Sequence, residues 1–148
     1  MKGLRTGILI ADGGRARMLL ATGIGKPLQQ IEGADYRNPV PPDRELARDK
    51  PPRVHESMSP ARYASERDDL HEREERRFAL ELAKMLDARL EAREFDRLAI
   101  VAAPATLAVL RDAISEKVRE VVIAEIDKDL TKVPNHEIRR HLEDDLPI

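Results

Sequence analysis

His71 and Glu75 are the residues of this sequence whose types and spacing most directly suggest chemistry. Four residues apart, they share one face of a helix, where they could bind a metal ion, with Asp68 as a third ligand. However, no second histidine lies at a matching spacing, and the surrounding glutamates and arginines can pair among themselves. Helix capping and a solvated charged face explain the pattern better, so we expect no metal and no cofactor.

Other polar side chains lie next to predicted strand ends. Three acidic residues surround Lys128 where a predicted strand ends, and sites in α/β sheets gather at the carboxyl ends of strands. Simple strand termination, with Thr131 as a local cap, is an equally good interpretation. Together with the first predicted hairpin, these residues define a candidate cleft: Asp12, Arg15, Arg17, His71, Glu75, Asp127 and Lys128.

Several common catalytic motifs are missing. The Gly25-Lys26 pair does not form a phosphate-binding loop, because Leu20 stands where glycine is required and Pro27 follows the lysine. No serine lies in a Gly-x-Ser-x-Gly elbow. The chain has no cysteine, which excludes thiolate catalysis and disulfides. The sequence therefore assigns no catalytic residue.

Residues 37–67 differ in composition from the rest of the chain. They contain six of the ten prolines and show no hydrophobic period, which predicts a long loop. Arginine grips phosphates bidentately, and mobile basic segments often become ordered on RNA. The alternative is a solvated loop whose charges balance one another. The candidate RNA-binding residues are Arg37, Arg44, Arg48, Lys50, Arg53 and Arg62.

The overall charge conceals an asymmetry. The 148 residues carry a net charge of -2, which argues against a protein that coats nucleic acid along its whole surface. Residues 1–67, however, hold 12 basic and 8 acidic groups, whereas residues 68–148 hold 14 and 20. No apolar run approaches the ~20 residues of a membrane span, and no secretory signal begins the chain, so we expect a cytoplasmic protein without membrane contact.

The elements that must position these residues alternate between strands and helices. Apolar runs and turn signals predict strands at 7–11, 15–20, 28–34, 98–103 and 121–126, and helices at 68–93, 105–111 and 135–142. Asp69 and Glu72 are spaced as a capping box at the start of the long helix. The pattern predicts an α/β single domain over residues 1–148. Its mixed five-stranded sheet begins as an antiparallel meander and continues as parallel β-α-β-α units.

Three stretches in order resemble one family. They are residues 8–17, with the turn Asp12-Gly13-Gly14; residues 69–79, with Leu70-His71-Glu72; and residues 95–104 together with 124–131. They resemble the bacterial host-attachment proteins, a family described as required for attachment to host cells. This family is similar in turn to the middle domain of archaeal and eukaryotic peptide-chain release factors. The resemblance runs from about Ile8 to Leu142 and implies a fold like that middle domain.

The resemblance also bears on function. Release factors carry a Gly-Gly-Gln tripeptide on the loop before the long helix, but residues 37–67 contain neither glycine nor glutamine. The resemblance therefore implies a non-catalytic cytoplasmic binding domain of the translation-factor type, which contacts ribosomal RNA or tRNA and does not release peptides. The alternative is a small hydrolase of phosphoesters or esters that uses His71 with nearby carboxylates.

Overall fold

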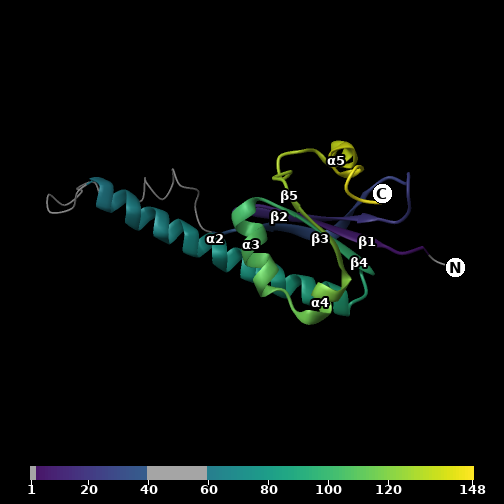
Figure 1. Cartoon of the computed structure of the whole chain (residues 1–148), viewed down its shortest axis with the longest axis horizontal. Helices are drawn as coiled ribbons and strands as arrows, with labels where there is room; N and C mark the ends of the chain where they lie inside the picture. Colours follow the sequence, from purple (N-terminus) through teal and green to yellow (C-terminus); the bar gives the residue numbers. More distant parts are fainter. Residues whose placement is uncertain (1–2, 40–59) are drawn as a thin grey trace.

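A five-stranded mixed sheet organises the chain, whose computed structural model describes residues 3–39 and 60–148 (Figure 1). The strand order is β3-β2-β1-β4-β5, with antiparallel pairs among the first three strands and parallel pairs on the other side of β1. This arrangement confirms the predicted α/β single domain with a mixed sheet. The strands are β1 (Thr6–Ala11), β2 (Arg15–Ala21), β3 (Gln29–Arg37), β4 (Arg97–Ala102) and β5 (Val122–Asp127).

Helices cover both faces of the sheet (Figure 1). On one face, apolar side chains of three helices pack against β1, β2 and β4, with Phe78, Leu82 and Leu110 among those buried. On the other face, the last helix and the C-terminal residues cover Ile8 and Ile10. Because β1 lies between these layers, all six of its residues are buried, as its continuous apolar run predicts. The helices are α2 (Pro60–Glu91), α3 (Pro104–Ala113), α4 (Glu116–Val121) and α5 (Asn135–Leu142).

The long helix α2 begins earlier than the sequence predicts. It starts at Pro60 and not at Asp68, so Asp69 lies inside the helix and the predicted capping box does not mark its start. Proline suits the first helical turn because that turn needs no backbone donor. Among the described side chains of the helix, the first buried apolar one is Phe78, and Leu82 and Leu86 follow at helical spacing on the same face. The turns before Phe78 extend past the edge of the sheet, where Leu70 is 39% exposed (Figure 1).

The predicted loop 37–67 is also shorter at both ends. Arg37 is the last residue of β3, and residues 60–67 belong to α2, while residues 40–59 lie outside the described part of the chain. A register shift in the pairing of β2 with β3, where Gly33 has a φ of +74°, lets β3 continue to Arg37. None of the described helices is both long enough and apolar enough to cross a membrane.

Candidate anion-binding site

The turn between β1 and β2 is held in place by the side chain of Asp12. Its Oδ1 accepts hydrogen bonds from the backbone N–H groups of Gly14 at 2.8 Å and of Arg15 at 2.9 Å. Gly13 lies against α2, because a Cβ atom added there would be 2.3 Å from Cδ of Glu75. A side chain at Gly13 would therefore displace the carboxyl end of Glu75 from its present position.

Thr131 connects this turn to the segment after β5. Its hydroxyl lies 3.0 Å from Asp12 Oδ2 and 2.6 Å from Asp129 Oδ1, and its side chain is buried. The backbone N–H of Thr131 also donates to Asp129 Oδ1 at 3.1 Å. Because a hydroxyl has one proton to donate, it satisfies one of the two carboxylates at a time. Thr131 thus links distant segments of the chain. The sequence suggested Thr131 as the local cap, but in this turn the side chain that accepts a backbone N–H is Asp129.

Arg17 on β2 also holds the segment after β5, through hydrogen bonds from its side chain. Its guanidinium donates to the carbonyl oxygen of Thr131 at 2.9 Å and to that of Val133. Its Nε is buried without a hydrogen-bond partner. Burial, followed by the nearby positive charge of Arg15, lowers the pKa of Arg17, while the carboxylate of Asp35 opposes this effect. The guanidinium remains charged at neutral pH and adds positive potential to its surroundings.

Arg15, Arg17 and Arg37 line a single small pocket. Arg15 is paired directly opposite Arg37 in the ladder between β2 and β3, and Arg17 is paired opposite Asp35. Because side chains alternate along a strand, all four lie on the face of the sheet that α5 covers, opposite the face that takes Ala16. We call this cavity of about 100 Å³ the arginine pocket; its lining consists of Ile10, Arg15, Ala16, Arg17, Asp35, Arg37 and Thr131.

The charge of the arginine pocket is unbalanced. Three arginines face one aspartate in its lining, and like charges directly opposite each other on a sheet are unfavourable. Among the described residues, the side chains of Arg15 and Arg37 form no ion pair. The arrangement offers guanidinium donors to an anion that would relieve the repulsion.

A shallow groove of about 540 Å³ continues from the arginine pocket toward α5. It shares Arg15, Arg17 and Thr131 with the pocket and adds the exposed side chain of Lys132. At its far end Asn135 donates from Nδ2 to Gln30 Oε1 at 2.8 Å. Arg15, Arg17 and Lys132 therefore place positive charge along this face.

The other predicted cleft residues lie on α2 and around the end of β5. His71 Nε2 lies 2.7 Å from Glu75 Oε1 on α2, which packs on the opposite face of the sheet. Lys128 Nζ donates to the carbonyl oxygen of His141 at 2.9 Å and lies 3.4 Å from Asp145 Oδ2. Lys128 thus holds the end of α5, and the exposed Asp127 ends β5. The structure brings together Asp12, Arg15 and Arg17, and it places the pair of His71 and Glu75 on α2, where Glu75 lies against the neighbouring turn at Gly13.

The predicted RNA-binding residues are described only in part. Arg37 lines the arginine pocket, and Arg62 falls within α2. The other four, Arg44, Arg48, Lys50 and Arg53, lie outside the described residues. Asp35 was not singled out from the sequence, because only the strand register places it opposite Arg17. Within the described ranges, no three histidine, aspartate or glutamate side chains are grouped as metal ligands.

Comparison with known proteins identifies one family. The sequence model of the family described as "Protein required for attachment to host cells" matches residues 7–142. This match spans all the described strands except Thr6, the first residue of β1, and it includes all four described helices. None of the curated proteins matches the chain.

Proposed function

The chain belongs to the family of proteins required for attachment to host cells, and we propose that it is a non-catalytic domain that binds RNA phosphates through the arginine pocket. The observation that carries this proposal is the cluster of three guanidinium groups around one cavity. Arginine binds phosphate oxygens bidentately, and phosphate contacts supply most of the affinity for RNA that does not depend on base sequence.

The size of the pocket favours a phosphate group over a nucleotide. Its volume of about 100 Å³ is well below the ~300–1,000 Å³ of cavities that enclose a drug-sized ligand. In this proposal one phosphate enters between Arg15 and Arg37, and the next lies along the groove near Lys132. Arg17 contributes charge and position, because its donors already hold the carbonyl oxygens of Thr131 and Val133.

The RNA in this proposal is ribosomal RNA or tRNA, and the protein acts in the cytoplasm. We also propose that the fold is related to the release-factor middle domain, since a long helix follows the antiparallel meander and leads into parallel strands. Arg44, Arg48, Lys50 and Arg53 would extend the same contact. Without a Gly-Gly-Gln tripeptide before the helix, the domain would bind the ribosome without releasing peptides.

Ribosome co-sedimentation over a range of salt concentrations tests this function. We expect binding that weakens steeply with salt. In an Arg15→Gln/Arg37→Gln variant the salt dependence should be shallower by about 0.7 for each single-stranded phosphate that the protein no longer neutralises. Lys84→Gln on the exposed side of α2 is the charge control and should bind normally. Equal binding of the double variant and the unmodified protein would exclude the arginine pocket.

The alternative function, a hydrolase of phosphoesters or esters, is supported by the 2.7 Å contact between His71 and Glu75. A carboxylate in this position can hold an imidazole in the tautomer that a general base needs. Screens with phosphatase and esterase substrates test the alternative. It predicts turnover that disappears in His71→Gln and persists in the Arg15→Gln/Arg37→Gln variant, the reverse of the effects expected for RNA binding.

A further inference from the structure

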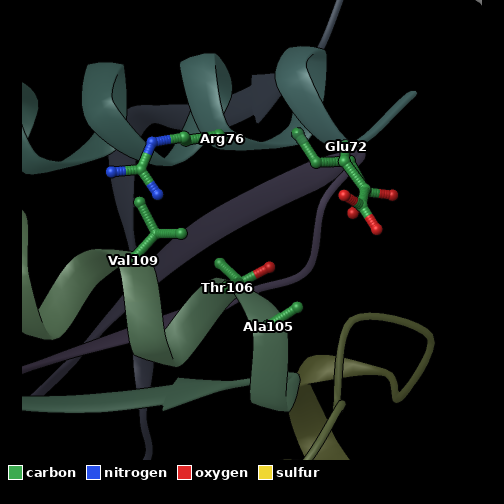
Figure 2. Close-up of a pocket in the computed structure, with 6 residues that line it drawn as sticks. Glu72, Arg76, Ala105, Thr106 and Val109 are labelled. Atoms are coloured by element: carbon green, nitrogen blue, oxygen red, sulfur yellow. The ribbon is translucent and has the colours of Figure 1, made fainter. Parts of the chain in front are cut away.

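A second pocket lies on the other side of the sheet, between α2 and the start of α3 (Figure 2). Its volume is about 230 Å³, which suits a molecule smaller than a typical drug. Arg76 and Glu72 reach toward it from α2, and Thr106 lies across from them on α3 (Figure 2). We call it the α2–α3 pocket; its lining consists of Glu72, Glu75, Arg76, Ala105, Thr106 and Val109.

Glu72 and Arg76 line this pocket without pairing with each other. A glutamate four residues before an arginine is the arrangement that most favours an ion pair along a helix. The same helix forms such pairs elsewhere, for example between Arg77 and both Glu74 and Glu81. Among the described residues, Glu72 and Arg76 have no ion-pair partner. The Glu72 carboxylate and the Arg76 guanidinium are therefore both available to bind a ligand in the pocket.

The start of α3 adds hydrogen-bond donors to the same pocket. Pro104 is at its first position, and no side chain caps it. The first hydrogen bond of the helix runs from the N–H of Leu107 to the carbonyl oxygen of Ala103 at 2.8 Å. The backbone N–H groups of Ala105 and Thr106 come before this bond and therefore have no acceptor within the helix. Backbone N–H groups at the start of a helix that lack an acceptor within the helix form a favourable binding site for an anion.

Thr106 adds a side-chain hydroxyl to the same pocket. The residue is only 5% exposed and lines the pocket. Its hydroxyl forms no hydrogen bond with another described residue, and it is not among the buried side-chain atoms that lack a partner, so it is open to the pocket. A molecule in the pocket could therefore form a hydrogen bond with this hydroxyl.

We propose that the α2–α3 pocket binds a small zwitterion of the amino-acid class. The carboxylate lies between the Arg76 guanidinium and the donors of Ala105 and Thr106, and the ammonium lies at Glu72. Glu75 is the weaker partner, because it is already bound to His71 at 2.7 Å. Val109 and the methyl group of Ala105 border the pocket, which favours a small apolar side chain on the ligand.

A ligand with both charges explains the lining better than a simple anion or cation. An anion alone would leave the Glu72 carboxylate facing a negative charge, and a cation alone would face Arg76 and the start of α3. A molecule with a separated carboxylate and ammonium satisfies both ends. This site lies on the face opposite the arginine pocket, so it does not rest on the proposed RNA binding.

Titration of the full chain with each standard amino acid, followed by amide chemical shifts, tests the proposal. We expect shifts around residues 72–76 and 104–109 with the small apolar amino acids. Arg76→Gln should weaken binding about tenfold or more, because it removes a charge-assisted hydrogen bond. The isosteric Thr106→Val should weaken it about two- to tenfold. Arg73→Gln, an exposed neighbour outside the pocket lining, is the matched control and should leave binding unchanged.

Three outcomes would overturn the proposal. The first is that none of the amino acids binds. The second is that Arg76→Gln and Thr106→Val bind as tightly as Arg73→Gln while all three remain folded. The third is that propionate binds as tightly as alanine, which would remove the role of Glu72. Because Arg15→Gln/Arg37→Gln should retain full amino-acid binding, failure of the RNA proposal and failure of this one give different results.

Discussion

Replacement of Arg37 by glutamine tests whether repulsion between the arginines of the arginine pocket lowers the free energy of unfolding while their charges favour RNA binding. Arg37 lies directly opposite Arg15 in the strand ladder, and neither side chain has an ion-pair partner among the described residues. Like charges opposite each other on a sheet cost about 0.2–1 kcal/mol. Because Arg37 is exposed, solvent screens the repulsion and we expect the lower half of this range. Arg37→Gln should therefore raise the free energy of unfolding while it weakens RNA binding.

The assay combines denaturation with binding at two salt concentrations. At low salt we expect the melting temperature of Arg37→Gln to rise by up to about 2 °C, and at high salt we expect the gain to disappear as the charges are screened. Binding to a single-stranded RNA oligonucleotide should weaken, and its logarithmic salt dependence should become shallower by about 0.7. Lys84→Gln should leave both quantities near their original values, because it removes a charge from the opposite side of the molecule.

Two results would refute this reasoning. If Arg37→Gln is no more stable than the unmodified protein at low salt, the guanidinium groups do not repel each other as their register implies. If RNA affinity and its salt dependence are unchanged, phosphate does not enter the arginine pocket. A gain in stability with unchanged binding would support the electrostatics of the pocket and reject its function.

Other substitutions test the contacts that hold the fold and the site. Thr131→Val should lower the free energy of unfolding by about 1–3 kcal/mol in urea, because it removes the hydroxyl between two carboxylates, whereas Thr22→Val should change it little. Phe95→Ala should lower it by about 3–5 kcal/mol, because the ring is 1% exposed and packs against Gly7, whereas Leu4→Ala, at a 57% exposed position, should have little effect. The backbone N–H of Arg5 donates a hydrogen bond to the carboxylate of Asp96 at 2.8 Å and lowers the pKa of Asp96. The ionised carboxylate therefore stabilises the fold at pH values above its unfolded pKa. This contribution is lost as the pH falls through the folded pKa. Asp96→Asn should therefore be less stable near neutral pH and should match the original protein only when the pH is below the folded pKa of Asp96; a difference that does not depend on pH would contradict this explanation.

The local pattern of residues predicted most of the fold. The apolar runs at 7–11 and 98–103 predicted buried strands, because only strands covered on both faces are continuously apolar. In the sequence of β2, Arg15 and Arg17 alternate with Ala16 and Met18, but only the structure shows that the long helix covers the face with Ala16 and Met18. The start of that helix was wrong by eight residues, because its first turns project beyond the sheet and carry no apolar stripe.

The sequence by itself determined which side chains could do chemistry and which strands could carry them. Only the tertiary structure decided which of these meet. Thr131 is 119 residues from Asp12, yet its hydroxyl lies 3.0 Å from that carboxylate. Arg15 faces Arg37 because a register shift in the pairing of β3 brings it there. Hydrophobic periodicity is a local property, whereas strand register and contacts between distant segments depend on how the whole chain packs, so the charge of the arginine pocket emerges only in the folded protein.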